Sequence, residues 1–232
     1  MADLSQAQPV AFNCEGGLVK NRSTFMMQPG EALELENFEP DVEGGYKRIK
    51  GFAKYVTAAV THTSSTSETI LMVASFADKV VAARGTSIFQ ATPGGSSWTS
   101  IDSGRTNAKK YNFERFNFDG NEKLIVVDQT NAPTVFNSSF SATDISESSI
   151  AGSKFVAAFK NHMFYAGNST SPQEVVFSQP FDEDAFSSAS GAGSIKVDDN
   201  ITGLKVFRDN LFIFCENRIF KLGGSSLSDF AV

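Results

Sequence analysis

The chain has 232 residues, enough for one all-β domain with its own hydrophobic core. Its formal charge of −6 argues against a broad nucleic-acid footprint, because nucleic-acid-binding proteins cluster Lys and Arg. No stretch approaches the roughly 20 consecutive apolar residues of a membrane helix, and the first residues lack the basic and apolar regions of a secretory signal. We therefore expect a soluble chain made in the cytoplasm.

Residues 1–50 differ in composition from the rest and are predicted to form an extended N-terminal arm. They hold three of the seven Pro and show no sustained alternation of apolar and polar residues. Pro29-Gly30 predicts a turn, and residues 31–38 fit either a short strand or one helical turn. A short strand is expected at Tyr46–Ile49. The predicted organisation is thus an arm, 1–50, followed by one main domain, 51–232.

Apolar and polar residues alternate strongly from Lys54 onward, which is typical of half-buried β-strands. Turn signals such as Ala77-Asp78 and Gly85-Thr86 separate the apolar runs. The expected strands are 55–61, 69–76, 79–84, 87–91, 98–101, 111–118, 123–128, 134–136, 154–159, 162–166, 174–177, 203–207, 211–215 and 218–222. They group into four meander units of about 51–105, 106–149, 150–200 and 201–232. A polar excursion without strands is expected at 178–193.

Two hairpins are near copies of one another, Phe159–Tyr165 and Phe207–Ile213, and their leading Phe residues lie 48 positions apart. A weaker copy, Phe118–Val126, starts 41 positions before the first of these. A period of about 40–50 residues built from antiparallel strands is the signature of propeller blades. The sequence therefore predicts an all-β, β-propeller-like fold of about four blades. Because only three strands of the last unit are accounted for, we expect an incomplete ring that needs a further segment or a partner.

The aromatic residues are mostly Phe, with 22 Phe against four Tyr and one Trp. Phe has no polar group, so it fills cores and interfaces rather than binding hydrogen-bonding ligands. The two cysteines, Cys14 and Cys215, are predicted to be small buried apolar groups, and a disulfide between them is left open.

No constellation of residues predicts an enzyme. His62 lies in a polar strand end or loop, and His162 is predicted to be a turn residue. The acidic groups 182–184 and 198–199 lack the spacing of a Ca²⁺ loop and are predicted to be solvated turns. Residues 190–194 resemble half of a phosphate-binding loop but are followed by no helix, so a flexible linker is expected. We predict no catalytic residue, no metal and no cofactor.

The arm resembles the N-terminal arm of a family of tailed-bacteriophage virion proteins. The similarity rests on Gly16-Gly17-Leu18-Val19, on 29–38 (Pro-Gly-Glu-Ala-Leu-Glu-Leu-Glu-Asn-Phe), and on 44–52 (Gly-Gly-Tyr-Lys-Arg-Ile-Lys-Gly-Phe). The segment Val175–Asp182 is similar to a blade-edge segment of those proteins. The resemblance covers the arm well and the blades loosely.

The resemblance implies a non-enzymatic structural protein of the phage tail or neck, similar to the propeller-bearing tail nozzle proteins. Such proteins form homo-oligomeric rings around the DNA channel, so the expected partners are other virion proteins and further copies of the chain. DNA is expected to pass nearby without specific binding, because negative potential repels phosphates. The implied location is the virion tail, after synthesis in the host cytoplasm. Family members are usually longer, which implies a fragment, a processed piece or a shortened relative.

Symmetric rings use heterologous contacts between neighbouring copies, and an arm can supply such a contact during viral assembly. The predicted interface residues are Leu33, Leu35, Phe38, Tyr46, Arg48 and Phe52. The opposing hypothesis is that the arm folds back on its own first blade.

Two other functions are compatible with a propeller. A glycan-binding or glycosidase-like module would need Trp and Tyr along a pocket and two carboxylates from different blades. The single Trp98 argues against this alternative. A cellular repeat scaffold is the second, and it would give the arm no counterpart.

Overall fold

The computed structural model describes residues 15–60, 69–106 and 109–232. The chain divides into two compact units, Met1–Ala53 and Lys54–Val232. Regular structure is almost entirely β, and the short helical turns are the 3₁₀ segments η2 (Thr24–Met26), η3 (Ser148–Ile150) and η4 (Ser188–Ser190). Within the described ranges, no helix is long and apolar enough to cross a membrane.

The first unit contains two small strand pairs. Strand β1 (Gly17–Leu18) pairs parallel with β2 (Glu31–Ala32), and β3 (Phe38–Pro40) pairs antiparallel with β4 (Tyr46–Arg48). The 31–38 segment, left open between strand and helical turn, thus contributes to two strands and to no helix. Across residues 15–53 only Gly30 is buried. The described arm therefore has hydrogen-bonded local structure and no hydrophobic core of its own.

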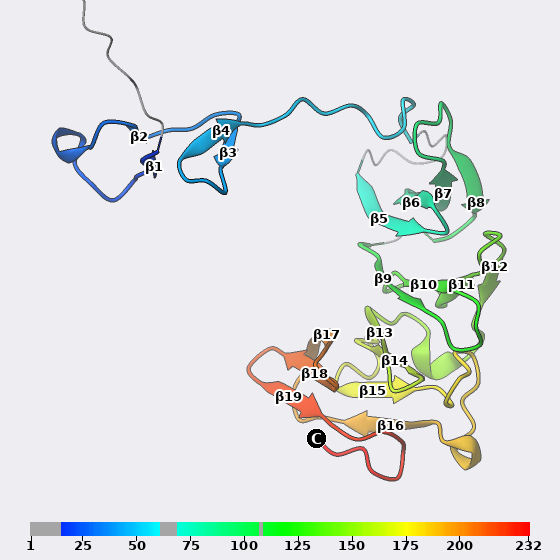
Figure 1. The fold of residues 1–232 in the computed structure, drawn as a ribbon. Coiled ribbons are helices and arrows are strands. Elements are labelled where there is room, and N and C mark those ends of the chain that lie inside the picture. The colour runs from blue at the N-terminus through cyan, green and yellow to red at the C-terminus, as the bar shows by residue number, and fades with distance from the viewer. Residues whose placement is uncertain (1–14, 61–68, 107–108) are drawn as a thin grey trace, which may run out of the picture. The chain divides into compact units, whose positions relative to one another are not determined.

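The second unit is built from four antiparallel meanders, which follow one another along the chain (Figure 1). The first sheet is β5 (Ile70–Phe76), β6 (Lys79–Arg84), β7 (Ser87–Ala91) and β8 (Thr99–Asp102). The second is β9 (Asn112–Phe116), β10 (Lys123–Val127), β11 (Thr134–Phe136) and β12 (Ala142–Asp144). The third is β13 (Phe155–Phe159), β14 (His162–Ala166), β15 (Glu174–Phe177) and β16 (Gly193–Lys196). The fourth has three strands, β17 (Ile201–Phe207), β18 (Asn210–Cys215) and β19 (Ile219–Leu222).

A Phe ends the first strand of every sheet. In three sheets a two-residue turn follows it, and both turn residues have positive φ, as a type I′ hairpin turn requires. These turns are Ala77-Asp78, Lys160-Asn161 and Arg208-Asp209. The second sheet has a longer loop between Phe116 and Lys123, which form the closing pair. The strand register thus identifies Phe116, not the expected Phe118, as the counterpart of Phe159, and it adds Phe76 as a fourth copy.

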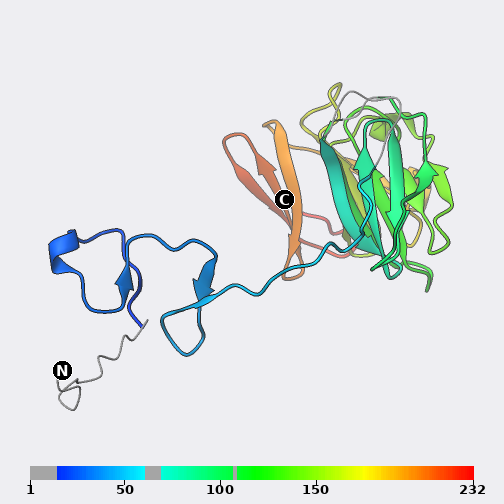
Figure 2. The same cartoon turned by 90° about the horizontal axis from the view of Figure 1, so that it is seen from above.

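Consecutive sheets pack face to face. One cluster joins the first and second sheets through Phe76, Leu124 and Phe136. Another cluster, around Phe116 and Met163, joins the second sheet to the third. The cluster that contains Phe159 and Leu211 joins the third sheet to the fourth. Among the described residues no hydrophobic cluster joins the first sheet to the fourth. The four sheets therefore form a row in chain order, with the first and fourth sheets at its ends. In Figure 2 the orange and brown strands toward the C-terminus stand apart from the cyan-green strands of the first sheet.

This arrangement explains the sequence pattern of the strands. Strands β10 and β14 are apolar at nearly every position and are almost wholly buried, because a sheet lies on each side of them. Strands β5 and β18, in the two end sheets, alternate between buried and exposed positions. In these strands the alternation reflects a sheet with a neighbour on one side only.

The prediction of a strand at 55–61 is wrong for residues 55–60, the part of it that the structure describes. Residues 55–60 form no strand and instead lie against the first sheet, where Val60 packs with Ala82 and Phe89. Gly94 N–H donates to the Tyr55 carbonyl at 2.7 Å, and Trp98 Nε1 donates to the Ala58 carbonyl at 3.0 Å. The segment bonds to a loop and a side chain because β6, β7 and β8 already pair with one another.

The outer strands of the second and third sheets were not expected. Residues 142–144 form β12, and Gly193–Lys196 forms β16 in the region expected to be a polar excursion and a flexible linker. Both are short and polar, so their sequence lacks an alternating signal. Each forms because the preceding strand offers an unpaired edge, to which β16 binds in register with β15.

Candidate interaction surfaces

The predicted interface residues of the arm are all at least partly exposed. Leu33, Phe38, Arg48 and Phe52 are exposed, and Leu35 and Tyr46 are half-buried. The hairpin β3–β4 brings two of them together, since the rings of Phe38 and Tyr46 meet edge to face with centroids 5.6 Å apart. Phe52 is 94% exposed and lies outside both strand pairs.

The six residues thus form no single cluster. They are distributed over the linker between β2 and β3, the hairpin, and the chain that follows it. Their common property is an apolar or cationic side chain that the described arm leaves accessible.

The fourth sheet has an exposed apolar face. Phe207, Phe214 and Ile219 are exposed there, and Phe212 is half-buried. In the strand register Lys205 and Lys221 flank Phe212, one on each side. The guanidinium of Arg208 lies over the Phe207 ring, 5.3 Å from its centroid. This face therefore combines apolar side chains with cations.

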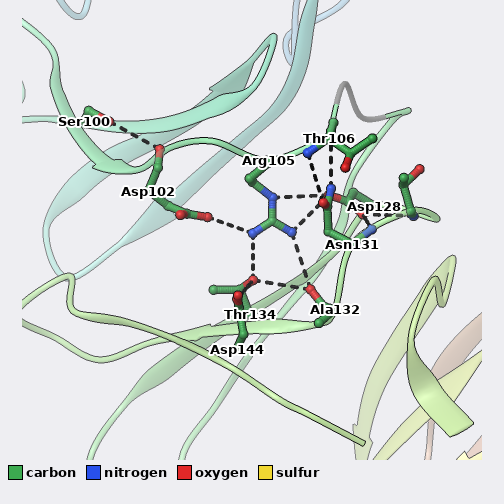
Figure 3. A network of polar contacts seen from close by, with 10 residues as sticks. Ser100, Asp102, Arg105, Thr106, Asp128, Asn131, Ala132, Thr134 and Asp144 are labelled. Carbon is green, nitrogen blue, oxygen red and sulfur yellow. Dashed lines mark hydrogen bonds and ion pairs between the residues drawn. The ribbon is translucent and has the colours of Figure 1, made fainter. Parts of the chain in front are cut away.

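A buried polar network centres on Arg105, which lies between the first and second sheets (Figure 3). Its Nη1 donates to Asp102 Oδ2 and to Thr134 Oγ1, both at 2.7 Å. Its Nη2 and Nε donate to Asp128 Oδ2 at 3.0 and 3.2 Å. Thr134 in turn donates to Asp144 Oδ1 at 2.6 Å. One guanidinium thus links the end of β8 to three segments of the second sheet.

Asp128 is held as a carboxylate. Burial favours its neutral form, but hydrogen bonds from the backbone and side chain of Asn131, together with Arg105, outweigh this and lower the pKa of Asp128. Burial also opposes the charge on Arg105, but the bond to Asp102 and the interactions with Tyr111 and Asp128 together outweigh it and raise the pKa of Arg105. Arg105 and Asp128 are thus held as a buried ion pair that links the first and second sheets.

Sequence reasoning missed this network. Asp128 directly follows the apolar run of β10, and an acidic residue at the end of a buried strand is a usable signal for a buried partner. Nothing in the sequence pairs it with Arg105, because the two residues belong to different repeats and meet only when the sheets pack.

The prediction that His162 is a turn residue is wrong. His162 is the first residue of β14, and its side chain is buried. Nδ1 lies 2.6 Å from the Ser178 carbonyl oxygen, and the ring packs edge to face against Phe177 and Phe230. The turn is complete at Asn161 because two residues suffice for a type I′ turn. His62 lies outside the described residues.

The acidic segment 182–184 is solvated only in part. Glu183 is buried and pairs with Lys123 at 2.8 Å, so the expectation of a solvated turn is wrong for this residue. The Tyr165 hydroxyl donates to the Glu183 carbonyl at 2.9 Å. The segment thus fastens the loop between β15 and β16 to the second sheet. Asp199 accepts bonds from Asn200 N–H and Asn217 N–H, as expected of a turn.

Among the described residues, no three His, Cys, Asp or Glu side chains are placed to share a metal ion. Cys215 is a free, buried cysteine, and Cys14 lies outside the described ranges. Trp98 is half-buried against Val60, with its indole N–H bonded to the backbone. Its ring thus packs in part against the small cluster of Val60, Ala82 and Phe89.

No protein-family model matches this sequence, and neither does any curated protein sequence. Solved structures are similar in fold. The computationally designed protein Ika4 aligns with TM-score 0.50 and 10% identity over 74% of this chain and 98% of its own. BBS1N, crystallised with ARL6DN, aligns with TM-score 0.48 and 10% identity over 72% of this chain and 52% of its own. The N-terminal domain of Nup159 aligns with TM-score 0.45 and 5% identity over 67% of this chain and 45% of its own. The chain spans about half the length of these last two proteins.

Ika4 is a designed β-propeller, and the sheet topology described above agrees with that architecture. The identities are too low to carry function across. The chain is an all-β protein whose second unit is β-propeller-like, with four meander sheets, and whose first unit is the N-terminal arm.

Proposed function

We propose that this chain is a non-enzymatic structural subunit of a bacteriophage tail or neck, a component of a nozzle-like homo-oligomeric ring around the DNA channel. The observation that carries the proposal is the arm. Its described residues form two hydrogen-bonded strand pairs but leave Leu33, Phe38 and Phe52 exposed. An arm of this kind gains stability when it lies on the surface of a neighbouring subunit.

The free energies of burial and association favour an interface that buries several anchor side chains of the arm together. Burying one Phe or Leu side chain contributes about 1.5–3 kcal/mol, whereas association costs on the order of 4–15 kcal/mol in lost freedom. A single anchor is therefore insufficient, and the six predicted residues together are adequate. The resemblance of 16–19, 29–38 and 44–52 to phage virion arms supplies the biological setting.

The interior polar groups support a structural role. The Arg105 network, His162 and Glu183 are all engaged in bonds that hold sheets and loops together. The indole N–H of Trp98, the single Trp, is already bonded to the Ala58 carbonyl, which disfavours the glycan-binding alternative.

Deleting residues 1–45 tests the proposal in a phage that carries this gene. We expect virions to lose the protein and to assemble tails poorly, measured by immunoblot of purified particles and by plaque yield. Within the full chain, Phe38→Asp is expected to reduce incorporation. Phe25→Asp is the matched control, because Phe25 is an exposed arm Phe outside the predicted anchors. Normal incorporation of the truncated protein contradicts the proposal.

A further inference from the structure

The four sheets contact one another in one repeated way. We call the face of a sheet that carries the Phe at the end of its first strand the leading face, and the opposite face the trailing face. Phe76 lies in the cluster with the second sheet, Phe116 in the cluster with the third, and Phe159 in the cluster with the fourth. Every internal contact therefore joins a leading face to the trailing face of the next sheet.

The fourth sheet breaks this rule. Phe76, Phe116 and Phe159 are at most 6% exposed, whereas their counterpart Phe207 is 59% exposed. Phe214 and Ile219 on the same face are also exposed. The leading face that three sheets bury is thus left open on the fourth.

The first sheet shows the complementary defect. Val73 lies three residues before the hairpin Phe of its sheet, and Phe113, Val156 and Leu204 hold the same position in the other sheets. Those three pack in the clusters with the preceding sheet. Val73 is 62% exposed, and Ile70 on the same strand is exposed as well. Val60 and Trp98 already cover part of the trailing face over β6 and β7, so the open part lies on β5.

The open part is where a neighbour would contact it. Within the row, neighbouring sheets touch mainly through their first strands, β9 against β13 and β13 against β17. A sheet packed on β5 would reproduce this contact while residues 55–60 remain in place.

We infer that copies of this chain associate head to tail, with the leading face of the fourth sheet of one copy packed on the trailing face of the first sheet of the next. This continues an interface that the chain already makes three times. Two leading faces packed on each other would bring Lys205, Lys221 and Arg208 of both copies together, and opposed like charges are costly. A head-to-tail contact is heterologous and can close into a ring. The inference rests on the proposed assembly function and names the surface used.

The test uses the full-length chain, with self-association measured by analytical ultracentrifugation and native mass spectrometry. Phe207→Glu should weaken self-association at least about tenfold, equivalent to about 1.4 kcal/mol. Phe181→Glu is the matched control, since Phe181 is also a surface Phe, 60% exposed, and lies on neither end face. Val73→Glu should weaken association like Phe207→Glu. Near-UV circular dichroism checks each fold, and Ile70→Glu replaces Val73→Glu if that variant does not fold.

Mixing the two variants is decisive. The Val73→Glu chain keeps its leading face and the Phe207→Glu chain keeps its trailing face, so the mixture should give 1:1 heterodimers and nothing larger. Wild-type-like association of Phe207→Glu overturns the inference. So does loss of association in Phe207→Glu without loss in Val73→Glu, which indicates another partner for this face. If the wild-type chain does not self-associate, both this inference and the proposed function fail. If the wild-type chain self-associates and only deletion of the arm abolishes that self-association, the proposed function stands and this inference fails.

Discussion

At the scale of single residues, polar groups buried between sheets decide which contacts are specific. Hydrophobic packing tolerates sliding of one sheet on another, whereas Arg105 can satisfy Asp102, Asp128 and Thr134 in only one arrangement. Tyr111 lies beside this network, with the Arg105 guanidinium 5.6 Å from its ring centroid, and burial raises its pKa to about 12. The region is therefore dry, and an unpaired charge there is costly.

Replacing Asp128 by Asn should lower the free energy of unfolding by about 3–5 kcal/mol, because Arg105 keeps its buried charge and loses its most deeply buried carboxylate partner. Asp209→Asn is the control: Asp209 also pairs with a cation, Lys160 at 3.3 Å, but its side chain is 91% exposed. We expect its effect to stay below about 1 kcal/mol. Urea unfolding at neutral pH measures both, and equal effects would contradict a structural role for the buried pair.

The pH dependence has a definite sign. Because the pKa of Asp128 is lower in the folded chain than its ordinary value of 3.8, the unfolded chain takes up the proton first as the pH falls. The stabilisation is fully present above pH 3.8 and is lost as the pH falls through the folded value. Unfolding measured from pH 6 downward should show this loss in the wild type and a shallower slope in Asp128→Asn.

At the scale of elements, hairpin turns set the register of every sheet. A type I′ turn needs two residues with positive φ, a region that costs most L-residues roughly 1–2 kcal/mol and that Asn and Asp tolerate best. Three turns place Asn or Asp in the second position, but the first turn has Ala77 at φ 46° in its first position. Ala77 therefore adopts a backbone conformation that Ala disfavours.

Ala77→Asn should therefore raise the free energy of unfolding by about 0.5–1 kcal/mol. Ala142→Asn is the control, because Ala142 is exposed in β12 without positive φ. That variant should be neutral or slightly destabilising. Thermal unfolding of the two proteins side by side measures the difference, and an Ala77→Asn protein no more stable than the control would show that the turn carries no strain.

At the scale of the whole molecule, the hydrophobic core that stabilises the fold belongs to the second unit and not to the arm. The buried hydrophobic residues lie in the second unit, and across 15–53 only Gly30 is buried. Residues whose side chains remain accessible to water contribute little to the hydrophobic free energy of folding.

Removing residues 1–45 should consequently change the melting temperature of the remaining chain by no more than about 2 °C, while abolishing incorporation into particles. Differential scanning calorimetry of the full-length and truncated proteins measures the first effect. A large drop in melting temperature would favour the opposing hypothesis, in which the arm folds back on its own domain.

The sequence alone determined the fold class, since the Phe-led hairpins recur at a propeller period and strand alternation is a local property of the chain. It also located the second strands of all four sheets, because buried apolar runs such as β10 and β14 are unambiguous. It could not locate β12, β16 or the loop-bound segment 55–60, whose conformation is set by a free strand edge or a neighbouring loop. Only the tertiary structure joined Arg105 to Asp128 and exposed Phe207 while burying Phe76, Phe116 and Phe159. Those differences depend on which sheet has a neighbour, and a residue's immediate sequence carries no information about that.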